Sequence, residues 1–115
     1  MRWMQEMAPQ DLFISAITLT EIRFGIEEMP PGLRRSNLTQ WLTQDLQHGF
    51  AGRIIPVDQR VAQEAGRLIS VGKRKGAKPD LADALIAATA RVHSLKLATL
   101  NTTHFQPLGV DLVKW

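Results

Sequence analysis

The sequence predicts an α/β fold with a largely parallel sheet. Short apolar runs typical of buried strands alternate with longer segments in which apolar residues recur at helical spacing, and the connections are short. Such alternation is typical of layered structures in which helices cover a parallel sheet. A length of 115 residues is enough for one hydrophobic core, and no repeat or low-complexity tract divides it. We therefore expect a single domain.

Each element has its own local signal. Apolar runs predict strands at 12–17, 53–58, 95–101 and 109–115. Apolar periodicity predicts helices at 18–29, 33–47, 58–75 and 80–93. Pro30 and Pro31 end the first helix because proline cannot continue one, and Asp58 opens the third. Either Gly72 or Gly76 is expected to stop that third helix.

Composition excludes several classes of protein. The absence of cysteine rules out disulfide frameworks, cysteine-based zinc sites and thiol catalysis, and is compatible with a reducing cytoplasm. No apolar run reaches the length of a membrane helix, and residues 1–11 carry polar groups where a signal peptide is apolar. The net charge of +3 is a mild basic bias, compatible with a polyanionic partner. The basic run at 72–78, GKRKGAK, fits a helix C-terminus and leaves room for phosphate contacts.

Acidic residues lie near the starts of two predicted helices. Asp80 and Asp83 stand at the head of the segment 79–90, which is otherwise almost entirely small and apolar, and Glu21 follows Thr18 at the spacing of a capping box. Capping alone explains each acid, since a carboxylate in a first turn stabilises the helix dipole by about 0.3–1 kcal/mol. The surroundings of Asp83 favour a further role, because an unpaired carboxylate beside an apolar core is costly and a divalent cation would relieve that cost.

The sequence resembles the PIN-domain ribonucleases, most closely the VapC and FitB toxins of bacterial type II toxin–antitoxin pairs. The runs LFISAITLTEIRFGIEEMPPGLRR, RIIPVD, PDLADALIAATARVHSLKLATLNTTHF and LGVDLVKW carry the resemblance, in family order from about Asp11 onward. The most specific part is DALIAATA followed by A-T-x-N-x-x-x-F. The resemblance implies a three-layer α/β/α fold around a mainly parallel sheet.

The function implied by this resemblance is metal-dependent cleavage of RNA by a cytoplasmic toxin. Such enzymes gather three or four acids around Mg²⁺ or Mn²⁺, hard cations that prefer oxygen ligands. Residue by residue, Glu21 matches the second family acid, Asp83 the third, and Asn101 a polar position near the fourth. Glu21 and Asp83 are therefore the expected metal ligands, and these two residues with Asn101 the expected catalytic set.

The sequence departs from the family pattern in two places. The first family acid lies in an N-terminal strand, typically just before Thr-Asn or Thr-Ser, and residues 1–115 contain no such strand. We therefore expect a single PIN domain over residues 1–115 that lacks its N-terminal strand. By itself this chain is expected to be poorly folded or aggregation-prone and inactive as a nuclease, because strands beside the missing one would expose unpaired backbone groups. His104 stands where many relatives carry aspartate, which argues against a second metal.

Alternative functions and partners follow from the same residues. A catalytically inactive PIN-like module that binds an antitoxin or RNA is the main alternative, and a metal-independent nuclease built on histidines is a third. The resemblance also implies a homodimer and a VapB-type antitoxin. We expect the tail of that antitoxin to lie in a groove formed by the helices around 21–41, with Phe24, Ile26 and Trp41 as candidate contacts. At least one of these three residues is expected to pack in the core instead.

Overall fold

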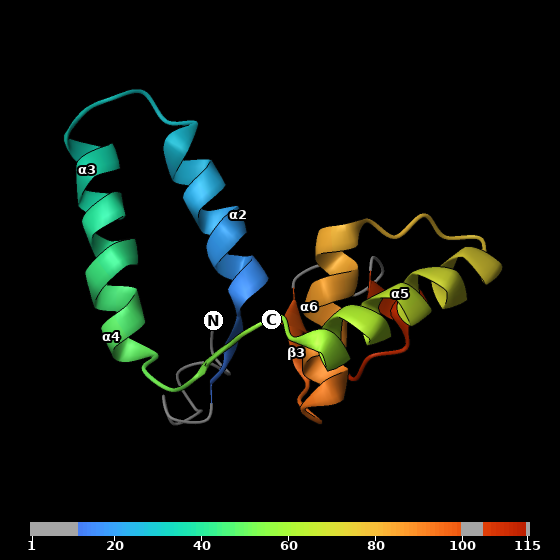
Figure 1. The fold of residues 1–115 in the computed structure, drawn as a ribbon. Coiled ribbons are helices and arrows are strands. Elements are labelled where there is room, and N and C mark those ends of the chain that lie inside the picture. Colours follow the sequence, from blue (N-terminus) through green and yellow to red (C-terminus); the bar gives the residue numbers. More distant parts are fainter. Residues whose placement is uncertain (1–11, 100–104, 115) are drawn as a thin grey trace. The chain divides into compact units, whose positions relative to one another are not determined.

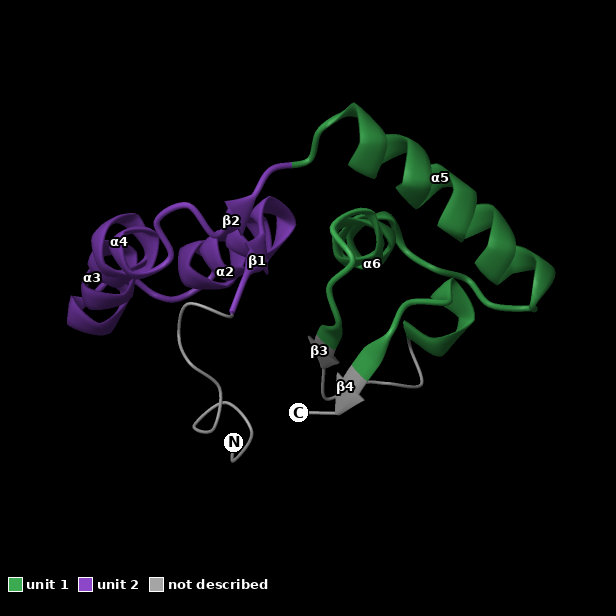
Figure 2. Cartoon of the chain, turned by 90° about the horizontal axis from the view of Figure 1, so that it is seen from below, with its two compact units in different colours: residues 1–5, 57–115 green, residues 6–56 purple. Residues whose placement is uncertain are grey.

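The computed structural model describes residues 12–99 and 105–114, and the chain divides into two compact units (Figure 2). Unit 1 comprises Met1–Gln5 and Val57–Trp115, and unit 2 comprises Glu6–Pro56. In the described part of the chain, each unit has its own helices and its own parallel pair of strands.

Unit 2 is built mainly from two helical stretches. In chain order its elements are β1 (Ile14–Ser15), α2 (Ala16–Glu27), α3 (Leu33–Gln40), the π-helical segment η2 (Trp41–Leu46), α4 (Gln47–Gly49) and β2 (Ile54–Ile55). The stretch from α3 through η2 to α4 lies beside α2 (Figure 1). Glu27 of α2 accepts a hydrogen bond of 3.0 Å from Arg35 of α3. Strand β1 pairs with β2 in parallel, with Ile14 opposite Ile54.

The start of α2 differs from the sequence-based prediction. The predicted strand 12–17 is cut short because the Ser15 hydroxyl accepts a hydrogen bond of 3.1 Å from the N–H of Ile17, which caps a helix that begins at Ala16. Thr18 therefore lies inside the helix, and the first turn of α2 contains no acidic residue. The capping box predicted for Thr18 and Glu21 is wrong.

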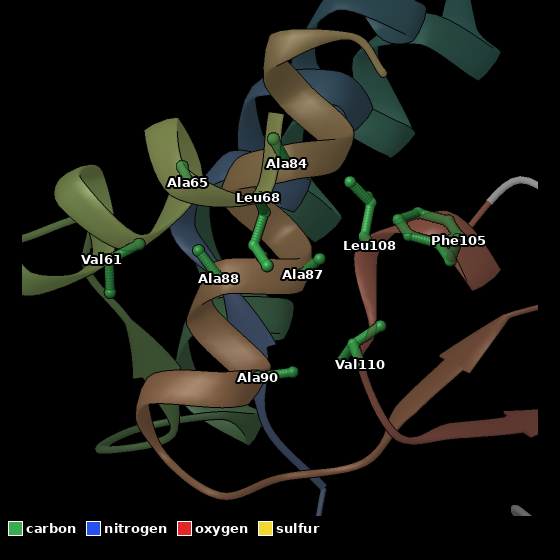
Figure 3. Close-up of a cluster of buried hydrophobic side chains, with 10 residues drawn as sticks. All are labelled: Val61, Ala65, Leu68, Ala84, Ala87, Ala88, Ala90, Phe105, Leu108 and Val110. Atoms are coloured by element: carbon green, nitrogen blue, oxygen red, sulfur yellow. The ribbon is translucent and has the colours of Figure 1, made fainter. Parts of the chain in front are cut away.

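Unit 1 contains the main hydrophobic core. Its described elements are α5 (Gln59–Arg74), α6 (Leu81–Val92), β3 (Leu97–Thr99), the 3₁₀ helix η3 (Gln106–Leu108) and β4 (Leu112–Lys114). Figure 3 shows buried side chains from α5, α6 and the segment around η3 meeting in one cluster: Val61, Ala65, Leu68, Ala84, Ala87, Ala88, Ala90, Phe105, Leu108 and Val110. Small residues on α6 bring that helix close to α5. Strand β3 pairs with β4 in parallel.

The ends of α5 and α6 follow the local signals of the sequence. Asp58 caps α5, its Oδ1 accepting a hydrogen bond of 3.0 Å from the N–H of Val61, and Asp80 caps α6. Gly76, at φ +83°, follows the last turn of α5 in the left-handed conformation that glycine adopts readily. Gly72 is instead a buried residue within α5. The predicted α/β class and parallel pairing are confirmed.

Candidate functional site

The N-terminal end of α6 carries two carboxylates in different positions. Oδ1 of Asp80 accepts a hydrogen bond of 2.8 Å from the N–H of Asp83, so Asp80 is the N-cap of the helix. Asp83 lies in the first turn, where negative charge is favoured by the helix dipole. The Asp83 residue is half-buried, and its Oδ2 atom is shielded from solvent. The cap hydrogen bond of α6 therefore does not account for the presence of Asp83.

Glu21 occupies a different kind of position. It lies inside α2, beyond the first turn, and its residue is exposed. Because Ser15 supplies the cap of this helix, the presence of Glu21 is not explained by capping either. The third candidate, Asn101, and the neighbouring His104 lie outside the described residues.

The two acids fit a divalent cation in chemistry. Asp83 belongs to unit 1 and Glu21 to unit 2. Both supply carboxylate oxygens, the donors that Mg²⁺ and Mn²⁺ prefer. Within residues 12–99 and 105–114, however, no three histidine, cysteine, aspartate or glutamate side chains form a group that could hold a metal ion. The donor type fits, and the described residues do not by themselves supply a complete ligand set.

A charged cluster in unit 1 was not found by sequence reasoning. Glu64 of α5 accepts two hydrogen bonds of 2.7 Å from Nε and Nη2 of Arg67, and one of 2.9 Å from Nε of Arg91 on α6. These bonds lower the pKa of Glu64 from 4.5 to about 2, the bond from Arg67 contributing most and burial opposing it. The i,i+3 spacing of Glu64 and Arg67 is a visible signal, whereas the contact with Arg91 spans 27 positions.

The charged cluster lines an open depression of about 510 Å³. Its lining residues are Arg60, Gln63, Glu64, Arg67, Arg91 and Val92. Three guanidinium groups and a single carboxylate give this depression a net positive charge. A surface of this kind attracts anionic ligands.

Unit 2 has an apolar groove between α2 and the helical stretch that follows it. Its volume is about 530 Å³, and it is lined by Leu19, Thr20, Arg23, Phe24, Leu42, Thr43 and Gln47. Phe24 is 65% exposed and Trp41 is 38% exposed, so both are accessible to a partner. Ile26 is only 4% exposed, so it is not a surface contact, and it has the core position expected for at least one of the three candidates. No helix in the described part of the chain is long and apolar enough to cross a membrane.

Comparison with known proteins identifies the family. The PIN domain model matches residues 1–107. VapC ribonuclease Y4jK of Sinorhizobium fredii is 34% identical over 96% of this chain and 79% of that protein. Toxin FitB of Neisseria gonorrhoeae is 38% identical over 90% of this chain and 74% of that protein. The crystal structure of FitAcB from N. gonorrhoeae matches with a TM-score of 0.91 and 35% identity, over 98% of this chain and 81% of that one. The chain therefore belongs to the PIN-domain family, among relatives of the VapC ribonucleases and the FitB toxin.

Proposed function

We propose that this protein is a metal-dependent endoribonuclease toxin of a toxin–antitoxin system. The observation that carries the proposal is the N-terminal end of α6, where Asp80 makes the cap hydrogen bond and a second, half-buried carboxylate, Asp83, lies one turn further. Membership of a family that includes VapC ribonucleases supports the reaction class. In this proposal residues 1–115 form a single PIN domain.

In this proposal Asp83 and Glu21 are metal ligands. A Mg²⁺ or Mn²⁺ ion held by these two carboxylates would supply activation of the attacking water and would offset charge on the attacked phosphate. Asp83 is held on a helix whose neighbouring face is packed into the core through Ala84, Ala87 and Ala88, so its backbone position is rigid. Asn101 is proposed as a polar group near the reacting phosphate.

The test compares two isosteric changes at the same helix end. Asp83→Asn replaces a carboxylate with a poor Mg²⁺ ligand, and Asp80→Asn, the matched control, keeps a good N-cap. In a form of the protein that cleaves a single-stranded RNA in Mg²⁺, we expect Asp83→Asn to abolish cleavage, whereas Asp80→Asn remains active. EDTA should stop cleavage by the unmodified protein. Full activity of folded Asp83→Asn would refute the ligand role, and cleavage in EDTA would favour a histidine-based mechanism.

Glu21 is tested in the same assay. We expect Glu21→Gln to reduce cleavage strongly. Because Ser15 caps α2 and Glu21 is exposed, the free energy of unfolding should change by less than about 0.5 kcal/mol. Thermal denaturation followed by circular dichroism measures that change. A large loss of stability would instead assign Glu21 a structural role in α2.

A second candidate function is an inactive PIN-like module that binds an antitoxin or RNA without cleaving it. The observation in its favour is that residues 1–115 match only two acids, Glu21 and Asp83, of the three or four that such enzymes gather. Binding of RNA in Mg²⁺ or Mn²⁺ with no cleavage products over a long incubation would establish this alternative.

The proposed partner is a VapB-type antitoxin that occupies the apolar groove of unit 2. The exposed Phe24 at that groove offers a large aromatic contact of the kind that dominates binding energy. Co-expression with the product of a neighbouring small reading frame should give a complex without nuclease activity. Phe24→Ala should weaken that complex, while Leu33→Ala, at a more exposed residue outside the groove lining, should not. Equal weakening of the complex by the two variants would refute binding in the groove.

A homodimer of this protein is also proposed. Sedimentation of the free protein measures its mass and tests this proposal.

A further inference from the structure

One side of α5 carries an arginine stripe, defined as Arg60, Arg67 and Arg74. These residues recur every seven positions in an unbroken α-helix, so they lie on nearly the same side at intervals of about 10 Å. All three residues are exposed, while the buried stripe of the helix is formed by Val61, Ala65, Leu68 and Gly72. The amphipathic division of α5 therefore leaves a cationic ridge facing solvent.

The stripe continues into a lysine turn, defined as Lys73, Lys75 and Lys78, which are all exposed. The turn has a fixed shape. The N–H of Ala77 donates a hydrogen bond of 2.9 Å to the carbonyl of Gly72, and Pro79 packs directly on Gly72. Two residues beyond Lys78 the chain reaches Asp80, the cap of the helix that carries Asp83. The cationic surface therefore leads along the chain to the candidate catalytic end of α6.

Five of these six cations form no ion pair with a carboxylate of the described residues. Ion pairs among residues 12–99 and 105–114 involve four cations: Arg23, Arg35, Arg67 and Arg91. Arg60, Arg74 and the lysine turn are outside that set. The stripe and turn together hold six positive charges, in a chain whose net charge is +3. Concentrating charge in this way destabilises a fold by self-repulsion, and a polyanionic ligand relieves that cost.

Glu64 orients part of this surface without neutralising it. Arg67 uses Nε and Nη2 on Glu64, and Arg91 uses Nε on Glu64 and Nη1 on the carbonyl of Gly109. Each guanidinium keeps one terminal nitrogen outside these bonds. Planar guanidinium donors held in this way suit phosphate oxygens.

We propose that the arginine stripe and the lysine turn bind the sugar–phosphate backbone of the RNA substrate and guide it toward the end of α6 that carries Asp83. This inference rests on the proposed ribonuclease function. Contacts to backbone phosphates position a nucleic acid without reading its sequence, so the surface should serve RNAs of different sequence equally. Its contribution should also fall steeply with added salt, because each neutralised phosphate releases condensed counterions.

The experiment uses two charge-matched double variants in an Asp83→Asn background, where the RNA stays intact. The stripe variant is Arg60→Gln/Arg74→Gln, and the control is Arg34→Gln/Lys96→Gln, which removes the same charge at exposed residues elsewhere. Fluorescence anisotropy with a labelled single-stranded RNA gives the dissociation constant at several salt concentrations. We expect the stripe variant to bind more weakly and its salt slope to fall by about 1.4, and the control to match the parent. Thermal denaturation confirms that all variants are folded.

Several results would overturn the inference. If the affinities of the two double variants depend equally on salt, RNA binding by the arginine stripe is refuted. If the unmodified protein still cleaves RNA, the proposed function stands. If the stripe variant loses affinity only for a duplex DNA of equal length and not for RNA, the surface binds DNA. Failure of the unmodified protein both to bind and to cleave RNA would refute the proposed function together with the stripe.

Discussion

Arg91 on α6 donates a hydrogen bond of 2.9 Å from its Nε to Oε2 of Glu64 on α5. The same guanidinium also donates to the carbonyl of Gly109, just after η3. One side chain therefore joins three segments of unit 1 that pack around the same core. By contrast, Arg67 binds Glu64 from within the same helix, three positions away.

This difference predicts unequal effects of removing the two arginines. We expect Arg91→Ala to lower the free energy of unfolding by about 1–2 kcal/mol, because it loses bonds to a partly buried carboxylate and to a carbonyl. Arg67→Ala should cost less than Arg91→Ala, because Arg67 forms an exposed pair within one helix. Urea denaturation followed by circular dichroism measures both. An equal or larger loss for Arg67→Ala would contradict the tertiary role of Arg91.

The lowered pKa of Glu64 predicts how stability depends on pH. Its carboxyl has a pKa of about 2 in the folded protein, against 4.5 for the unperturbed group, so the unfolded chain binds the proton more tightly. The contribution of Glu64 is therefore fully present above about pH 5 and is lost as the pH falls toward 2. Glu64→Gln should be less stable at pH 7, and its stability should fall less between pH 5 and 2. Urea denaturation at several pH values gives the free energy of unfolding of the unmodified protein and of Glu64→Gln. If the two curves against pH run parallel, the prediction is refuted.

Replacing each of two glycines in α5 by alanine should change the stability of the protein in opposite directions. A Cβ added at Gly72 would lie 2.8 Å from Cγ of Pro79 and 3.5 Å from Cδ2 of Leu108, so Gly72→Ala forces packed groups apart. We expect a loss of about 1–3 kcal/mol. A Cβ at Gly66 would meet nothing within 4 Å, so Gly66→Ala should stabilise by about 0.5–1 kcal/mol through helix propensity. Stabilisation of both variants in thermal denaturation would contradict the close packing at Gly72.

The cap of α6 can be separated from the candidate metal ligand. Asp80→Ala removes the acceptor for the N–H of Asp83 and should cost about 1 kcal/mol of stability. Asp80→Asn should be close to neutral, because asparagine caps helices as well as aspartate. Denaturant titration of the two variants provides the comparison. A substantial loss for Asp80→Asn would mean that the charge of Asp80, and not its hydrogen bond, stabilises the helix end.

The sequence predicted the helices of unit 1 well. The caps at Asp58 and Asp80 and the terminating Gly76 are local signals, because the cap hydrogen bonds span three residues and the glycine conformation concerns one residue. The strands were predicted in the right places but too long. At 12–17 a cap formed by Ser15 starts the helix earlier than the apolar run suggested, because a hydroxyl hydrogen bond competed with strand pairing.

The sequence by itself determined the α/β class, the order of the elements and the placement of Asp83 in the first turn of α6, because each depends on residues close together in the chain. Only the tertiary structure decided that Ile26 is buried, that Gly72 packs against Pro79 and that Arg91 binds Glu64. These features depend on which helix faces meet. No local periodicity specifies that choice, because it is set by close packing of the whole core.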